Sequence, residues 1–252
     1  MIDLALKSIL DWIYPPTCAA CRTLIALNDT QPRDMMLCCS CQTLFEPIEP
    51  PICAFCGMPT ESEVDRCASC FGMLFGFTQN RAAFRYEGVV RDLLLELKFS
   101  NNKQIAHALG KLWAFHIAPM SMDSNYILTA LPMHKTKQRE RGFNQAEVLT
   151  QHLSQRLGIT MEKALLRIID TPPQSGLHPR ERIQNVDGAF AVAKNIDVSG
   201  KNYIIVDDIF TTGASLNACA KALLKSGAAG VRCMTLAIVE KREKGKESGF
   251  KT

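Results

Sequence analysis

The sequence has no long apolar run, no recognisable export signal and, before His107, no histidine. Its longest apolar runs, such as Tyr203–Val206, are far shorter than the roughly 20 residues that a membrane span needs. The start, Met1–Leu4, has an early aspartate and lacks both a basic segment and a cleavage site of small residues. We therefore expect a cytoplasmic protein without a membrane span, whose cysteines stay reduced. Reduced cysteines favour metal binding over disulfides.

Cysteine is concentrated where histidine is missing. Nine of the eleven cysteines fall between residues 18 and 70, and eight of them form four Cys-x-x-Cys pairs. The pairs are Cys18/Cys21, Cys38/Cys41, Cys53/Cys56 and Cys67/Cys70. Two pairs complete a tetrahedron of thiolates around zinc, and such a site has no open position for substrate. We predict two structural zinc ions, with sequential or interleaved pairing left open. A redox dithiol, the alternative, requires a βαβ context that this segment lacks.

Charge divides the chain at nearly the same place as the cysteines. Residues 1–80 carry four Lys/Arg against nine Asp/Glu, a net charge of −5, whereas residues 81–252 carry 25 against 16, a net charge of +9. Apolar residues in the first segment, including Ile2, Leu6 and Ile9, recur at helical spacing. We predict an N-terminal helix and double zinc ribbon over residues 1–80, a larger basic domain over residues 81–240, and a frayed tail over residues 241–252.

From Arg81 onward, segments typical of strands alternate with segments of helical periodicity. The expected strands are Ala82–Tyr86, Tyr126–Leu131, Ala164–Ile169, Gly188–Val192, Tyr203–Val206 and Val231–Val239. The expected helices are Val89–Phe99, Gln104–His116, Phe143–Leu157 and Ala214–Ser226. This alternation predicts an α/β fold with a doubly wound, mostly parallel sheet, in which ligands bind at the carboxyl ends of the strands.

The most informative stretch is Ile204–Ser215, in which an apolar strand leads to two carboxylates, a turn rich in hydroxyl groups and the start of a helix. Backbone N–H groups at a helix N-terminus favour an anion, and Gly213 allows the backbone to approach it closely. Adjacent Asp207 and Asp208 repel each other unless sugar hydroxyls or a magnesium ion occupy them. The pattern predicts a site for a phosphorylated ribose. It lacks the signatures of a P-loop and of a dinucleotide-binding fold.

This stretch resembles the 5-phosphoribosyl-1-pyrophosphate (PRPP) motif of type I phosphoribosyltransferases, and most of the chain resembles the ComF/GntX family. The matching pieces are the four cysteine pairs, Tyr86-x-Gly88, Lys98-Phe99, Leu131–His134, Arg139–Ala146, Gln174, Glu181-Arg182 and Asn185-Val186. The resemblance implies a double zinc ribbon joined to a phosphoribosyltransferase-like domain, with PRPP and magnesium as ligands. It implies that Asp207 and Asp208 contact the ribose hydroxyls. The 5-phosphate would lie on Thr211, Thr212, Gly213, Ala214 and Ser215.

Two further clusters carry positive charge. Between the strand ending at Leu131 and the helix beginning at Phe143 lie His134, Lys135, Lys137, Arg139 and Arg141. We predict that this loop binds pyrophosphate; a nucleic-acid backbone or plain solvation are the alternatives. The polar segment Thr171–Asn185 predicts a mobile loop. By resemblance it is a lid that brings Arg180 or Arg182 toward the leaving pyrophosphate, which makes these arginines catalytic candidates beside Asp207 and Asp208.

Three functions remain open from the sequence. The family is associated with natural transformation, so the first is a PRPP-binding competence protein that handles imported single-stranded DNA. The second is an active phosphoribosyltransferase that transfers the 5-phosphoribosyl group to a nitrogenous small molecule. The third is a non-catalytic scaffold whose zinc ribbons dock a DNA-uptake helicase or another competence protein. The segment Arg81–Ala118, which would cover the acceptor, contains no pattern that names one.

Overall fold

The computed structural model describes residues 15–25, 36–117, 125–170, 186 and 188–240. The predicted N-terminal helix, the predicted lid with Arg180 and Arg182, and the predicted tail lie outside these residues. The boundary near residue 80 coincides with the start of the first long strand, β1 (Asn80–Arg85), and as a domain boundary it stays a prediction.

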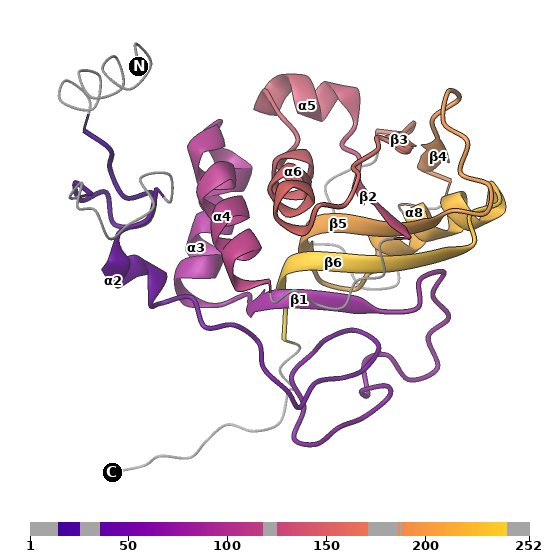
Figure 1. Ribbon diagram of the computed structural model, residues 1–252, viewed down its shortest axis with the longest axis horizontal. Coiled ribbons are helices and arrows are strands. Elements are labelled where there is room, and N and C mark those ends of the chain that lie inside the picture. Colours follow the sequence, from indigo (N-terminus) through magenta and orange to yellow (C-terminus); the bar gives the residue numbers. More distant parts are fainter. Residues whose placement is uncertain (1–14, 26–35, 118–124, 171–185, 187, 241–252) are drawn as a thin grey trace.

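A four-stranded parallel sheet with strand order β1-β6-β5-β2 forms the centre of the molecule (Figure 1). Its strands are β1, β2 (Tyr126–Ala130), β5 (Asn202–Phe210) and β6 (Gly230–Ile238). Two short strands, β3 (Leu165–Arg167) and β4 (Phe190–Val192), pair antiparallel in a separate sheet. The predicted mostly parallel α/β sheet is confirmed.

Helices follow the strands much as the periodicity predicts. The longer ones are α3 (Gly88–Phe99), α4 (Lys103–His116), α6 (Gln145–Leu157) and α8 (Ala214–Lys225), and the described part of the cysteine-rich segment contains the single turn α2 (Cys39–Gln42). The segment predicted as a basic loop is instead the short helix α5 (Lys135–Arg141). Its ends explain the difference, because the His134 ring accepts from the backbone N–H of Thr136 and Gly142 closes the helix at a φ of 77°.

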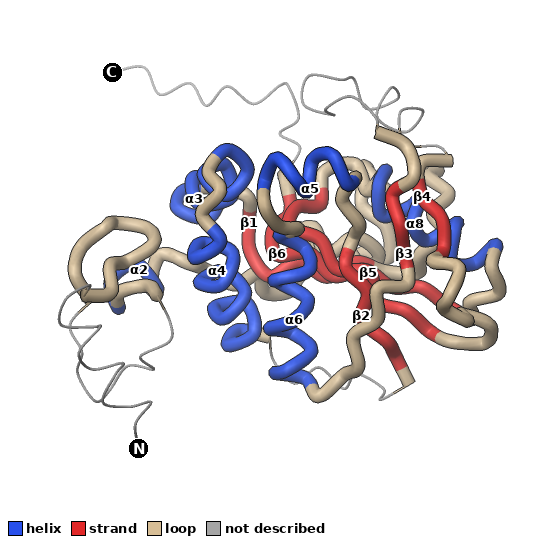
Figure 2. The backbone as a smooth tube through the Cα atoms, turned by 90° about the horizontal axis from the view of Figure 1, so that it is seen from above, coloured by secondary structure: helices blue, strands red, loops and turns tan. Residues whose placement is uncertain are grey.

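Both faces of the sheet are covered. Along β5, Ile204 and Val206 belong to a core with α3, α4 and α6, whereas the alternating Tyr203 and Ile205 belong to a second core with α8. Figure 2 shows α4 and α6 side by side over the strands, in agreement with their close packing. This two-sided burial explains why β5 is continuously apolar where it crosses the centre, and it confirms the doubly wound arrangement.

The two halves of the cysteine-rich segment pack against different cores. Cys18 and Cys41 are buried in the core that contains α3 and α4, whereas Cys53, Cys56 and Cys70 are buried in the core that contains α8. Hydrogen bonds anchor the second half to the domain: the Asn80 amide donates to the Cys56 carbonyl (3.0 Å), and the Gly76 N–H donates to the Asn217 side chain (2.7 Å). The two halves of the cysteine-rich segment therefore contribute to the cores on opposite faces of the sheet.

Candidate functional site

The eight paired cysteines form two separate clusters. The first cluster consists of Cys18, Cys21, Cys38 and Cys41, and the second consists of Cys53, Cys56, Cys67 and Cys70. In each cluster the four sulfur atoms lie within 4.8 Å of one another, and the pairs Cys21–Cys38 and Cys56–Cys67 are 3.7 Å apart. Sulfur atoms bound to a tetrahedral zinc at about 2.3 Å lie roughly 3.8 Å apart, so both clusters fit zinc. Pairing is sequential, which decides between the two arrangements that the spacing allowed.

Backbone groups support these thiolates. The N–H of Cys38 donates to the Cys18 sulfur (3.3 Å), and the N–H of Cys67 donates to the Cys53 sulfur (3.2 Å). In the first cluster, hydrogen bonds from Thr23 lower the pKa of Cys21 to about 6, which favours the thiolate that a metal requires. A zinc ion held by all four sulfur atoms of a cluster would have no open position for substrate, which indicates a structural role for both clusters.

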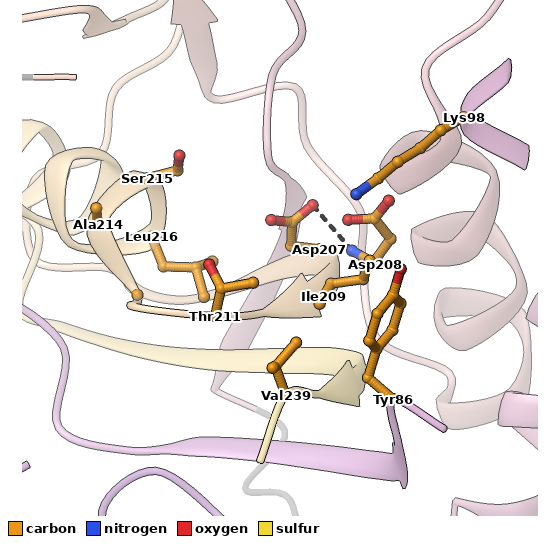
Figure 3. A pocket seen from close by; sticks show the side chains of 11 residues that line it. Tyr86, Lys98, Asp207, Asp208, Ile209, Thr211, Ala214, Ser215, Leu216 and Val239 are labelled. Carbon is orange, nitrogen blue, oxygen red and sulfur yellow. Dashed lines mark hydrogen bonds between the residues drawn. The ribbon is translucent and has the colours of Figure 1, made fainter. Parts of the chain in front are cut away.

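The PRPP-like stretch lines a pocket of about 290 Å³ at the carboxyl ends of β1, β5 and β6. Six of the seven residues predicted to contact PRPP line it: Asp207, Asp208, Thr211, Gly213, Ala214 and Ser215. Figure 3 shows them with the two carboxylates at one end and the start of α8 at the other. The seventh, Thr212, instead accepts a hydrogen bond from the backbone N–H of Ala214 (3.4 Å) through its hydroxyl, at the start of the helix.

The turn before α8 requires glycine. Gly213 precedes the helix with a φ of 72°, in the left-handed region that side chains other than glycine disfavour. A Cβ atom at this position would lie 3.0 Å from the Phe210 ring and 3.2 Å from the Phe75 ring. The bare backbone therefore leads directly into the N-terminus of α8, whose free N–H groups attract an anion.

The two aspartates lie inside β5 itself, beyond the predicted end of the strand at Val206. Pairing with β6 continues to Phe210, so the strand holds both carboxylates in place. The backbone N–H of Asp208 donates to Asp207 Oδ1 (2.8 Å), and the amide of Gln145 donates to Asp208 Oδ2 (3.2 Å). Burial raises the pKa of Asp207 well above its ordinary range, and the neighbouring charge of Asp208 raises it further. Holding two adjacent carboxylates in this buried position costs free energy, which a bound ligand would offset. A cation such as magnesium fits these hard oxygen donors, and so do the hydroxyl groups of a sugar.

Two residues complete the pocket from the opposite side. Tyr86 follows β1 and Lys98 lies in the last turn of α3, and both line the cavity. Figure 3 shows the lysine ammonium and the tyrosine hydroxyl directed toward the two carboxylates. Neither composition nor periodicity identifies Tyr86 and Lys98 as site residues. Only the family resemblance marks them, through its matching pieces Tyr86-x-Gly88 and Lys98-Phe99.

The basic cluster lies beside a different cavity from the aspartates. His134 and Lys135 line a second cavity of about 440 Å³ together with side chains of β3, and neither lines the PRPP-like pocket. Lys137 forms an ion pair with Asp170 (3.6 Å), and the His134 ring lies 3.4 Å from the same carboxylate. Arg141 donates to the side chain of Gln145 (3.0 Å). The exposed side chain of Arg139 borders a shallow hollow on α5. Pyrophosphate binding by this cluster stays a prediction.

Two protein-family models match this chain and define its class. Residues 9–71 match the double zinc ribbon domain family, and residues 144–252 match the phosphoribosyl transferase domain family. A hypoxanthine phosphoribosyltransferase from Staphylococcus aureus superposes with a TM-score of 0.32 at 12% identity, covering 62% of this chain and 68% of its own. Together with the sheet and the paired cysteine clusters, the two family matches define a double zinc ribbon followed by a phosphoribosyltransferase-like domain.

The relatives then identify the family. The competence protein ComFC of Bacillus subtilis is 30% identical over 211 residues, which covers 81% of this chain and 84% of the relative. The DNA utilization protein YhgH of Escherichia coli K12 is 29% identical over 231 residues, which covers 88% of this chain and 98% of the relative. The chain belongs to the ComF/GntX family. Among the described residues, no helix has the length and apolar character of a membrane span.

Proposed function

We propose that the pocket at the ends of β1, β5 and β6 binds PRPP. The observation that carries this proposal is one shared cavity for two adjacent carboxylates and a glycine turn at a helix N-terminus. The turn supplies N–H groups and the hydroxyls of Thr211 and Ser215 to the 5-phosphate, while Asp207 and Asp208 accept from the ribose hydroxyls. Thr212 contributes indirectly, because its hydroxyl accepts from the N–H of Ala214 and so supports the turn before α8.

Magnesium would be held by the same two carboxylates, since they are the hard oxygen donors of the pocket. When bound, it supplies positive charge to the phosphates. Lys98 adds a permanent charge directed at the same point, and its field lowers the pKa of Asp207 against the effect of burial. We expect Lys98 to favour the ionised form of Asp207 against the effect of burial when the ligand arrives.

In the cell, we propose that PRPP binding serves the handling of imported single-stranded DNA in the cytoplasm during natural transformation. Support comes from two relatives, one named a competence protein and the other a DNA utilization protein. The net charge of +9 beyond residue 80 adds electrostatic attraction to nucleic acid. A DNA-uptake helicase or another competence protein is the protein partner that fits this role.

Two rivals each have an observation in their favour. Catalytic transfer of the phosphoribosyl group is favoured by Tyr86 and Lys98, which border the ribose end of the pocket as acceptor contacts would. In that case Arg180 and Arg182 would approach the leaving pyrophosphate. A scaffold role is favoured by Phe71 and Leu74, which follow Cys70 and are 81% and 91% exposed. Release of pyrophosphate from PRPP with a panel of amines and bases separates transfer from binding.

Calorimetric titration with PRPP, with and without magnesium, tests the site. Replacing both acids (Asp207→Ala with Asp208→Ala) should weaken PRPP by more than about 100-fold, because the ribose loses its acceptors and the metal its ligands. Asp197→Ala is the matched control, since this exposed aspartate lies outside the pocket, and its affinity should stay within about twofold of the parent. Unchanged PRPP affinity in the double variant would refute the proposed site.

A further inference from the structure

The five residues from Arg141 to Gln145 connect the basic helix α5 to the PRPP-like pocket. Gly142 turns the chain after α5 and Phe143 is buried in the core beside α3 and α4. The Asn144 side chain accepts from the N–H of Ala146 and donates to the carbonyl of Leu131, both at 3.0 Å, so it fixes the start of α6 on the end of β2. The side chains of Arg141 and Gln145, at the two ends of this stretch, are hydrogen-bonded across the turn.

These two residues form a chain of hydrogen bonds that ends on a carboxylate of the pocket. The Arg141 guanidinium donates to Gln145 Oε1 (3.0 Å), and Gln145 Nε2 donates to Asp208 Oδ2 (3.2 Å). Gln145 and Asp208 are each only 7% exposed, so water competes little for these bonds. Arg141 is half-buried at the end of α5.

The direction of the Gln145 amide depends on the arginine. A carboxamide presents a donor at one end and an acceptor at the other, and it can rotate to exchange them. The guanidinium has donors only, so it holds the amide oxygen on its own side and turns the amide nitrogen toward Asp208. The carboxylate of Asp208 is thereby held through Oδ2, which leaves Oδ1 as the oxygen that can accept from a ligand hydroxyl.

We propose that Gln145 is a positioning residue for Asp208, and that Arg141 acts on the pocket through Gln145 instead of contacting pyrophosphate. This inference rests on the proposed PRPP site. A carboxylate that is already oriented loses less freedom when the ribose binds, so the relay raises the affinity for PRPP. It also gives Arg141 a role different from that of the other cations on α5, with which the sequence groups it.

Isosteric substitutions test the relay. Gln145→Met keeps the length of the side chain and removes the amide, and we expect it to weaken PRPP about 10-fold in calorimetry. Arg141→Met should weaken PRPP about threefold in the parent and not at all in the Gln145→Met background, because it acts through the missing amide. The same loss in both backgrounds, or no loss from Gln145→Met, would overturn the proposal. The control is Gln151→Met, an exposed glutamine on α6, which should leave the affinity unchanged.

A second set of probes separates positioning from direct contact. Glycerol 3-phosphate has a phosphate but no ribose ring, so its affinity should not change in Gln145→Met, and a parallel loss would indicate a general disturbance of the pocket. If Gln145→Met does not fold, Arg141→Met alone decides: the relay predicts weaker PRPP with unchanged inorganic pyrophosphate, whereas direct contact weakens both. Failure of the parent protein to bind PRPP would instead refute the proposed function, independently of the relay.

Discussion

Asp207 is a carboxylate placed where its charge is costly. Burial and the charge of Asp208 raise its pKa well above the ordinary value of 3.8, and no described residue closes an ion pair with it. A group with a raised pKa binds more protons in the folded chain than in the unfolded chain. Stability therefore falls as the pH rises from about 4 toward the folded pKa. Perturbed carboxylates of this kind are typical of functional sites, where stability is sacrificed for ligand binding.

At this scale we predict that Asp207→Asn stabilises the protein at neutral pH. The expected gain is on the order of 1 kcal/mol, or roughly 2–4 °C in thermal unfolding, and the loss of stability between about pH 4 and neutrality should shrink. The same variant should lose PRPP affinity. Asp197→Asn is the control of opposite sign, because hydrogen bonds from Ser199 lower the pKa of Asp197 and its charge is favourable in the fold. A lower melting temperature for Asp207→Asn would contradict the prediction.

Among the elements, the two cysteine clusters differ in how deeply they are built into the domain. In the second cluster Cys53, Cys56 and Cys70 are buried in the core beneath α8, and Phe55 stacks on Phe77 with ring centroids 5.3 Å apart. In the first cluster Cys21 is exposed and Cys38 is half-buried. We therefore expect a metal ion to be easier to reach in the first cluster, while the second contributes three of its cysteines to the core that contains α8.

We predict that a chelator removes zinc in two phases, the first from the cluster containing Cys21. Metal analysis of the parent should find two zinc ions per chain, and Cys21→Ser should lower the content to one with limited effect on the melting temperature. Cys53→Ser should destabilise the whole domain, by several kcal/mol, because a buried metal site and a packed core are lost together. Cys39→Ser serves as the control, since this exposed cysteine belongs to neither cluster. Simultaneous release of both ions would show that the clusters do not differ in access.

At the scale of the whole molecule, the net positive charge beyond residue 80 could attract either a small phosphorylated ligand or DNA. Part of the basic surplus lies on α5, where Lys137 pairs with Asp170 and Arg141 is engaged with Gln145. The ion pair with Asp170 offsets the charge of Lys137, and the hydrogen bond to Gln145 holds the Arg141 guanidinium, which keeps its charge, against α6. The proposed phosphate site lies in a different pocket. We therefore expect any contacts to DNA to come from cations spread over the domain.

We predict that single-stranded DNA binding weakens steeply with salt, because backbone contacts release counterions. Fluorescence anisotropy with a labelled oligonucleotide, at salt concentrations from about 50 to 200 mM, measures the slope of log K against log salt. Lys135→Gln with Arg139→Gln, two exposed cations of α5, should reduce that slope by about 1 to 2 units. Lys221→Gln with Lys225→Gln on α8 is the matched pair of equal charge change. A slope near zero in the parent would argue against DNA as a partner.

The sequence by itself determined the local features of this protein. Four Cys-x-x-Cys pairs with no histidine nearby favour all-thiolate sites, and the order of strand, acids, glycine turn and helix around Gly213 is a local pattern. Helices α3, α4, α6 and α8 follow from apolar periodicity, and strand β5 follows from a short continuous apolar run, because both patterns report burial directly. The basic segment was wrongly predicted as a loop, because its helix depends on caps at His134 and Gly142 and has no buried face.

Only the tertiary structure decided which distant groups meet. The structure shows that the cysteine pairs combine sequentially, that each cluster packs in a different core, and that Gln145 donates to Asp208. These contacts join segments far apart along the chain, and nothing in the sequence indicates that they meet. The same holds for Tyr86 and Lys98, which reach the acids because parallel pairing brings β1 and β5 to one edge of the sheet on either side of β6. Hydrophobic burial sets these meetings, since each face of the sheet must be covered by whichever elements the chain can bring to it.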